Sequence, residues 1–191
     1  QLATKLCAWM GAEDEQAAKQ QFYTSLERTG AGYFDFYLLH ALQPGTYQMY
    51  EKFHIWDFVR EQKAKGLIRH WGFSFHATPE ILDEVLTAHP DAEFVQLQIN
   101  YADWENPNVA ARANYEVARR HNKPVIIMEP VKGGMLANPP EAVREAFRSA
   151  GKSASYASWA IRYAASLDGI ITLLSGMSDM TEMSGSSSSM S

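Results

Sequence analysis

The chain contains 191 residues, of which 46% are apolar, and its 17 basic and 22 acidic side chains give a net charge of −5 at pH 7. These proportions are typical of one globular domain, and the acidic balance argues against nucleic acid as the main partner, because phosphate binding requires clustered Lys and Arg. No apolar run approaches the roughly 20 residues of a membrane span, and the single cysteine, Cys7, excludes an intramolecular disulfide and favours a reducing, cytoplasmic compartment.

The first half of the chain alternates between strand and helix patterns. Ala18, Phe22 and Leu26 recur four residues apart, as apolar residues do on one face of a helix. Gly30 follows that pattern and is expected to end the helix. In chain order, the predicted elements are a strand at 2–9, a helix at 13–29, an aromatic-rich strand at 33–40 and a helix at 50–65.

The second half repeats this alternation. Thr78 precedes Pro79, which suits an N-cap residue followed by proline at the first helical position. The segment 125–128 is continuously apolar, as expected of a strand buried on both faces. The predicted elements are strands at 68–74, 94–101, 124–130 and 169–174, and helices beginning at Thr78 and spanning 109–121, 141–149 and 155–167.

Six strands separated by helices indicate an α/β protein with a parallel sheet. Two architectures fit, an open doubly wound sheet and part of a (β/α)8 TIM barrel. No G-x-G-x-x-G follows the first strand, so a Rossmann dinucleotide site has no support. An eight-unit barrel needs about 250 residues. Six units fall two short of eight, so the barrel alternative predicts a partial barrel over residues 1–180, and the Ser-rich segment 181–191 is expected to be a tail outside the fold.

Polar residues gather where the predicted strands end, which is where (β/α)8 barrels place their chemistry. His40 ends the second strand, and Lys5 lies inside the first. Each also has a structural interpretation, as a histidine bonded to a backbone carbonyl and a lysine whose amine reaches solvent. Gly133 and Gly134 either form a simple turn or let a phosphate group approach the backbone N–H groups. The remaining strand-end residues are Ser74, Gln96, Gln98, Asn100, Met128, Glu129, Pro130, Lys132, Ser175, Gly176, Met177 and Ser178.

The sequence gives less reason to place the other histidines in a functional site. We expect His54, His70, His89 and His121 to lie on the surface, because they fall on helices or at strand starts. His76 directly follows a strand end, and its role stays open. No Cys/His cluster has the spacing of a zinc site, so no metal site is predicted.

Taken together, these strand-end segments resemble the aldo/keto reductase family. Residues 33–40 are similar to the family's strand that ends in the catalytic histidine, and residues 3–6 to the strand that carries its catalytic lysine. The resemblance covers about residues 2–180. The cofactor-binding segments of the family are matched, in the same order, by residues 72–74, 96–101, 128–136 and 175–178.

The resemblance implies a role for each matched residue. His40 would orient and polarise a carbonyl group, and Lys5 would lower the pKa of an acid/base tyrosine. The cofactor would be NADP or NAD, with NADP favoured, and the substrate a small aldehyde or ketone. The implied cofactor contacts are Ser74, Gln98, Met128, Glu129, Pro130, Gly133, Gly134, Ser175, Gly176, Met177 and Ser178.

One branch of the family matches best, the branch that carries a C-terminal ferredoxin-like iron–sulfur extension. A [4Fe–4S] cluster is therefore implied for the full-length protein, although not for this chain. Two positions depart from the family, because Phe75 stands where many relatives have Asn and Met128 where many have an aromatic ring on the nicotinamide. After Met177 the family's Arg and Asn cofactor contacts are missing, and the acid/base tyrosine and its aspartate are absent with the first two βα units.

Three hypotheses follow. The chain is an incomplete NAD(P)H-dependent carbonyl reductase, a non-catalytic nucleotide-binding protein derived from a barrel, or a barrel enzyme of another kind. Because the tyrosine is absent, we expect little or no reductase turnover from these 191 residues alone. The two open edges of a partial barrel would also favour self-association.

Overall fold

A single parallel sheet organises the chain. The computed structural model describes residues 1–150 and 154–176. Within these residues six strands lie in chain order across the sheet, and every neighbouring pair is parallel. The strands are β1 (Ala3–Leu6), β2 (Phe34–Leu42), β3 (Ile68–Phe75), β4 (Phe94–Gln98), β5 (Val125–Met128) and β6 (Ile170–Leu173).

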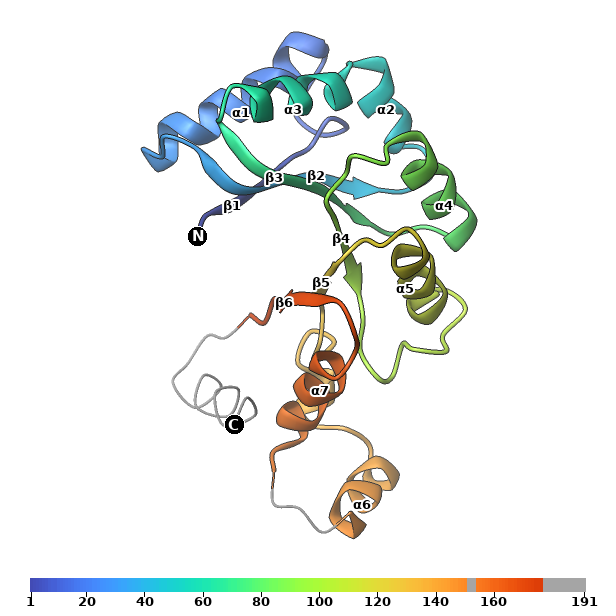
Figure 1. The fold of residues 1–191 in the computed structure, drawn as a ribbon. Coiled ribbons are helices and arrows are strands. Elements are labelled where there is room, and N and C mark those ends of the chain that lie inside the picture. The colour runs from blue at the N-terminus through green and yellow to red at the C-terminus, as the bar shows by residue number, and fades with distance from the viewer. Residues whose placement is uncertain (151–153, 177–191) are drawn as a thin grey trace.

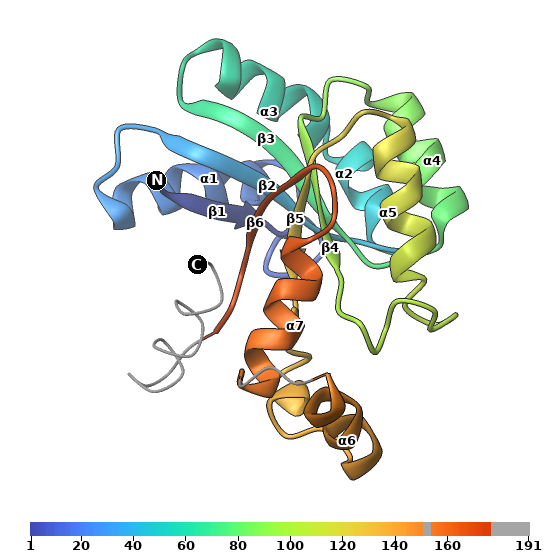
Figure 2. The same ribbon diagram turned by 60° about the horizontal axis from the view of Figure 1, so that its bottom comes forward.

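Helices cover the convex side of the curved sheet (Figure 1). Helices α4 and α5 lie side by side in this outer layer (Figure 2). The segment that holds α6 projects beyond the end of α7, away from the sheet (Figure 1). The helices are α1 (Glu15–Thr29), α2 (Tyr47–Lys52), α3 (Ile55–Ala64), α4 (Pro79–Ala88), α5 (Ala111–Arg120), α6 (Glu141–Ser149) and α7 (Tyr156–Ala165), with a 3-10 turn, η1, at Met135–Ala137.

The strand order decides between the two architectures. In a doubly wound sheet the order reverses at a switch point and helices cover both faces. Here the order runs from β1 to β6 without reversal, and the helices lie on the outer side of the sheet (Figure 1). This arrangement is that of a (β/α)8 barrel, so the prediction of a partial TIM barrel with six strands is confirmed.

Two layers of apolar side chains hold this arrangement together. The larger layer lies between sheet and helices and includes the buried ring of Phe22. That ring meets the rings of Phe34, Tyr37 and Phe58 edge-on, at centroid distances between 5.1 and 5.7 Å. In β2, Tyr37 faces the helices, whereas its neighbours Phe36 and Leu38 face the barrel interior, as the alternation of side chains in a strand requires. The smaller layer, on the inner face, consists of Leu38, Phe94 and Ile126, with Phe36 packed against them.

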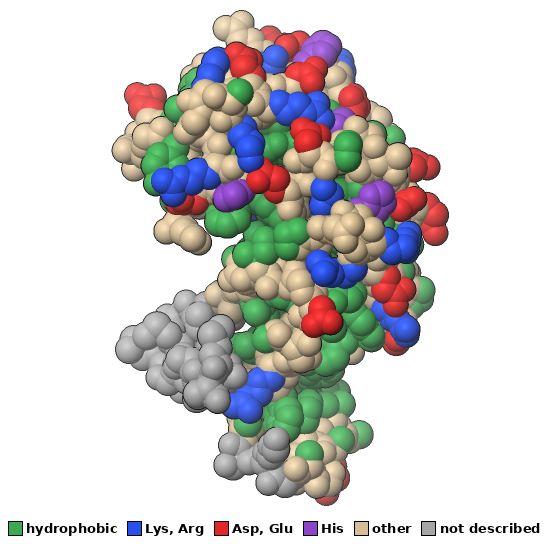
Figure 3. Space-filling view, in the orientation of Figure 1, with side chains coloured by type: hydrophobic (Ala, Val, Ile, Leu, Met, Phe, Trp, Pro, Cys, Tyr) green, Lys and Arg blue, Asp and Glu red, His purple; other side chains and the backbone are tan. Residues whose placement is uncertain are grey.

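The concave side of the molecule is open in the part of the chain that the structure describes. The space-filling view shows a hollow on this side, with hydrophobic side chains exposed in it (Figure 3). His70 illustrates this openness, because it is exposed although its ring lies 5.4 Å from that of the inner-face residue Phe36. The inner face is thus open to solvent at His70, whereas Leu38, Phe94 and Ile126 on the same face are buried.

Several predicted boundaries differ from the structure, and backbone geometry explains two of the differences. Strand β2 continues two residues past His40, through Ala41 in a left-handed conformation with φ of 52°. The single helix predicted at 50–65 is instead two helices, α2 and α3. His54 causes this break, because its φ of 48° interrupts the helical backbone between them. The predicted helix end at Gly30 is confirmed, and its φ of 63° suits glycine.

One histidine that we expected at the surface is buried. His89 is only 9% exposed, and its ring stacks on Trp56 with 3.7 Å between centroids. Arg60 Nη2 lies 3.1 Å from His89 Nδ1, and Glu51 Oε1 lies 3.0 Å from Nε2. Because a guanidinium only donates, Nδ1 accepts and Nε2–H donates to the carboxylate. The surface prediction for His89 was wrong, since the ring belongs to the packing between helices.

Candidate active site

Lys5 and His40 lie on the same face of two neighbouring strands. Lys5 in β1 is paired with Leu38 in β2, and His40 follows Leu38 by two residues. Burial lowers the pKa of Lys5. Burial also lowers the pKa of His40, and the positive charge of Lys5 lowers it further. The sequence prediction that these two side chains share one site is therefore supported by their placement and by their electrostatic coupling.

The backbone around His40 is fixed by two aromatic side chains. The His40 carbonyl accepts hydrogen bonds from Trp9 Nε1 at 3.1 Å and from the Tyr50 hydroxyl at 2.5 Å. The Trp9 ring also stacks on the imidazole, with 6.1 Å between centroids. Burial raises the pKa of Tyr50, so its phenol keeps the proton that it donates. The end of β2 is thus held in place before any ligand arrives.

Ser74 supports the same turn from β3. Its side chain is fully buried, and its Oγ accepts the backbone N–H of Ala41 at 2.8 Å. Ala41 carries the left-handed φ of 52° directly after His40. Ser74 therefore stabilises the strained residue that follows the histidine. A contact between Ser74 and a nicotinamide group stays a prediction, since the hydroxyl proton remains able to donate elsewhere.

Replacing Ser74 by alanine is expected to lower the free energy of unfolding by about 1–3 kcal/mol, because the buried Ala41 N–H loses its acceptor. Urea denaturation followed by circular dichroism measures this change. The matched control is Ser25→Ala in α1, whose Oγ only donates to the Gln21 carbonyl within a helix. Equal effects of the two substitutions would contradict the role of Ser74.

A polar network links the end of β4 to the loop after β5. Gln98 Nε2 and Asn100 Nδ2 donate to Asp103 Oδ2 at 3.0 and 2.9 Å, and the Lys132 ammonium pairs with Oδ1. Burial opposes ionisation of this carboxyl, but the hydrogen bonds from Lys132, Asn100 and Gln98 hold its pKa below the ordinary value. Asp103 is absent from the sequence-based site. The sequence feature that could have identified it is its place five positions after Gln98, just beyond the predicted strand 94–101.

The loop after β5 forms one wall of a cleft. The cleft has a volume of about 230 Å³, and β6 ends at its other wall. Gly133 and Gly134 have φ of 58° and 88°, and apart from its chain neighbours no atom lies within 4 Å of the position that a Cβ on Gly134 would take. A ligand can therefore approach the backbone here closely. Six residues predicted to contact a cofactor line this cleft, namely Glu129, Pro130, Gly133, Gly134, Ser175 and Gly176.

The remaining predicted contacts lie in other places. Met128 is paired with Gln98 across β4 and β5, and its sulfur accepts a hydrogen bond from Gln96 Nε2 at 3.1 Å. Met177 and Ser178 lie outside the described residues, as does the segment 181–191. The family-like segments therefore meet at the carboxyl ends of the strands, although Gln98 does not line the same cavity as the glycines.

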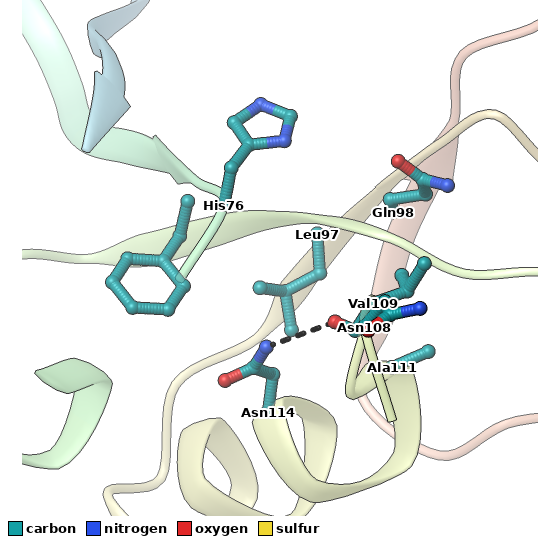
Figure 4. A pocket seen from close by; sticks show the side chains of 8 residues that line it. His76, Leu97, Gln98, Asn108, Val109, Ala111 and Asn114 are labelled. Carbon is teal, nitrogen blue, oxygen red and sulfur yellow. Dashed lines mark hydrogen bonds between the residues drawn. The ribbon is translucent and has the colours of Figure 1, made fainter. Parts of the chain in front are cut away.

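A smaller cavity of about 100 Å³ lies beside Gln98 (Figure 4). His76 and Gln98 lie along one side of it, and Asn114 of α5 lies across from them (Figure 4). Burial lowers the pKa of His76, and the charges of His40 and Lys5 lower it further. The histidine whose role the sequence left open is thus coupled to the Lys5 and His40 pair.

His40 is expected to titrate below the ordinary histidine value of 6.5, because burial and Lys5 both disfavour its charged form. A depressed pKa means that the folded chain binds fewer protons than the unfolded chain. The stabilisation from His40 is therefore complete above pH 6.5 and is lost as the pH falls through 6.5 toward the lower folded value. Proton NMR of the ring measures the midpoint, and Lys5→Met should raise it. A midpoint at or above 6.5 would contradict this electrostatic picture.

Neither a metal site nor a membrane span is found in residues 1–150 and 154–176. No group of three or more His, Cys, Asp or Glu side chains there is placed to hold a metal ion. No helix among the same residues is both long and apolar enough to cross a membrane.

Comparison with known proteins supports both the fold and the sequence resemblance. The sequence model of the Aldo/keto reductase family matches residues 1–191. No curated protein sequence matches the chain. Among solved structures, an aldo-keto reductase from Bacillus halodurans in its holo form superposes with a TM-score of 0.71 at 19% identity, over 99% of this chain and 66% of that one.

Two structures of an aldo/keto reductase from Klebsiella pneumoniae are also similar. The complex with NADP and acetate gives a TM-score of 0.72 at 17% identity and covers 98% of this chain and 64% of that one. The complex with NADPH gives 0.68 at 18% identity, over 98% of this chain and 63% of that one. At such low identity these structures establish a shared fold, and the chain spans about two thirds of their length.

Proposed function

The chain belongs to the aldo/keto reductase family, and we propose that it forms the larger part of an NADP(H)-dependent oxidoreductase that reduces an aldehyde or ketone to an alcohol. The observation that carries this proposal is the placement of Lys5 and His40 on the same face of adjacent strands, where the charge of Lys5 acts on His40. NADP is favoured over NAD because both Klebsiella pneumoniae structures contain it in oxidised or reduced form.

The cleft residues fit a cofactor that carries a diphosphate. Gly133 and Gly134 have no Cβ to block the approach, and within the described residues the Gly133 N–H donates to no backbone or side-chain acceptor. A free N–H in a left-handed turn suits an anionic oxygen. Ser175 and Gly176 line the same cleft. These four residues would hold the phosphates, and Gln98 and Met128 would face the nicotinamide.

Each residue of the pair has a distinct chemical task. NADPH, when bound, supplies the hydride for reduction. His40 stays neutral near pH 7, because its pKa is lowered, and it donates one ring N–H to the carbonyl oxygen. The Lys5 ammonium adds a positive field where negative charge develops on that oxygen. The family resemblance assigns the final proton to a tyrosine, so we propose that the 191 residues alone reduce carbonyls slowly or not at all.

Three finer expectations remain proposals. The full-length protein belongs to the branch with an iron–sulfur extension, and it resides in a reducing, cytoplasmic compartment. The third expectation is self-association of the chain through its open sheet edges.

Within the described residues β1 pairs only with β2 and β6 only with β5, and Leu2, Ile171 and Leu174 near these edges are between 36 and 46% exposed. Open strand edges favour pairing with another chain, so light scattering should detect self-association of the isolated chain.

Titration with NADPH tests the proposed function directly. Quenching of tryptophan fluorescence should saturate at one NADPH per chain. Gly134→Ala should weaken binding about tenfold, equivalent to about 1.4 kcal/mol, because a side chain enters the cleft. Gly66→Ala is the matched control, since Gly66 has a similar φ of 76° but lies between α3 and β3, at the opposite end of the sheet. A folded wild-type chain that binds no NADPH at millimolar concentration would refute the proposal.

A further inference from the structure

We propose that Asp103 is a positioning residue that fixes the orientation of the Gln98 side-chain amide, so that Gln98 presents its oxygen to the carboxamide N–H of a nicotinamide. This inference deepens the proposed function and rests on it. Asp103 lies in the loop after β4, between the strand that carries Gln98 and helix α5. Asp103 itself does not touch the cofactor in this arrangement.

The contact between Asp103 and Gln98 has only one chemically consistent orientation. Asp103 is fully buried, and its Oδ2 lies 3.0 Å from Gln98 Nε2. An ionised carboxylate can only accept hydrogen bonds, so the amide nitrogen of Gln98 must face it. The Gln98 Oε1 is then turned away from Asp103. A side-chain amide that could otherwise flip is held as an acceptor toward the site.

The surrounding groups keep Asp103 ionised. Lys132 pairs with Oδ1, and Asn100 Nδ2 donates to Oδ2 at 2.9 Å. The Asp103 backbone N–H donates in turn to Asn100 Oδ1 at 2.9 Å. Asn106 Nδ2 is within 3.5 Å of Oδ1. A buried carboxylate with this many donors remains charged, and each donor restricts its rotation.

The same network reaches the loop that lines the larger cleft. Asn100 Nδ2 also donates to the Glu129 carbonyl at 3.1 Å, and Glu129 has a left-handed φ of 56°. Lys132 belongs to this loop as well. If Asp103 only supported this loop, its substitution would weaken the binding of all dinucleotides by the same factor. If Asp103 acts through Gln98, the loss of affinity depends on the substituent of the nicotinamide ring. This difference separates the two explanations.

The test compares NADP⁺ with its analogue in which an acetyl group replaces the carboxamide and so cannot donate. Wild type should bind NADP⁺ more tightly than the analogue, by roughly 3- to 10-fold, the worth of one hydrogen bond. Asp103→Asn should reduce this preference to about onefold, because the Lys132 ammonium keeps the new amide oxygen on its side, so that the amide NH2 faces Gln98 and draws the Gln98 oxygen away from the site. Gln98→Leu should abolish the preference in the same way. Asp83→Asn is the matched control, since Asp83 pairs with His121 and Arg120 on the outer surface.

Each outcome has one meaning. A wild-type preference that survives in Asp103→Asn would overturn the role of Asp103 while leaving the proposed function intact. Wild type that binds neither dinucleotide would refute the proposed function itself. If circular dichroism shows that Asp103→Asn does not fold, the test is instead the hydrogen exchange rate of the Gln98 side-chain amide, measured in wild type. Slow exchange at neutral pH supports the contact, and exchange as fast as in a free glutamine overturns it.

Discussion

Replacing His40 by alanine in the full-length protein should lower kcat/KM for carbonyl reduction by about 100-fold or more, the usual range for loss of a positioned hydrogen-bonding group in proton transfer. NADPH affinity should stay within about twofold, because the cleft formed by Glu129 to Gly134 is built by other elements. The reason lies in the placement of the imidazole, whose backbone is pinned by Trp9 and Tyr50 before substrate binds. Steady-state kinetics with a small aldehyde, together with the NADPH titration, measures both quantities.

His70→Ala is the matched control for that experiment. His70 lies in β3 and, like His40, on the inner face of the sheet, but near the start of its strand. Its ring faces Glu93 at 2.8 Å rather than Lys5. We therefore expect kcat/KM to change by less than about twofold in this variant. If His40→Ala kept the wild-type kcat/KM, or if both histidines mattered equally, the assignment of His40 would be wrong.

Replacing Gly72 by alanine should lower the free energy of unfolding by about 3 kcal/mol, the upper end of the range for overpacking. Gly72 in β3 is paired with Phe94 in β4. A Cβ on Gly72 would lie 2.2 Å from the Phe94 carbonyl oxygen and 2.9 Å from its ring. Because one of these atoms belongs to the backbone, the strands themselves must move apart. Denaturation with urea, followed by circular dichroism, measures the loss.

Gly32→Ala provides the reference for that measurement. Nothing lies within 4 Å of the position that its Cβ would take. Its backbone does not have the positive φ that disfavours alanine. This substitution should leave stability within about 0.5 kcal/mol of wild type or raise it slightly, since alanine restricts the unfolded chain. A loss in Gly72→Ala no larger than that in Gly32→Ala would show that the two strands tolerate separation.

The fold class could be predicted from sequence because the hydrophobic period changes repeatedly between strand and helix. The continuous apolar run at 125–128 becomes β5, which is paired with β4 on one side and β6 on the other, as a buried strand should be. The choice between barrel and doubly wound sheet could not be made from periodicity. It depends on the spatial order of strands, which local sequence patterns do not encode.

The candidate site was predictable in its residue types and less so in its contacts. His40 stands out because it ends the predicted strand 33–40, and Lys5 because its amine lies inside an apolar strand. Ser74 also stands out, but its Oγ is engaged with the Ala41 N–H, a contact between positions 33 residues apart. Sequence patterns also missed that His89 stacks on Trp56 and that Asp103 pairs with Lys132, because these partners lie about 30 residues away along the chain. Tertiary partners of this kind decide whether a polar residue is buried.

The resonance of the Met128 methyl group offers the most direct test of a nicotinamide site at the carboxyl ends of the strands. Met128 ends β5 beside Gln98, whereas Met49 lies in α2 on the outer layer. The chain is labelled at its eight methionine methyl groups, and Met128→Leu and Met49→Leu assign the two signals. NADPH should shift the Met128 signal saturably and leave the Met49 signal in place. A Met128 signal that does not move at saturating NADPH would contradict the placement of the nicotinamide and with it the proposed reductase site.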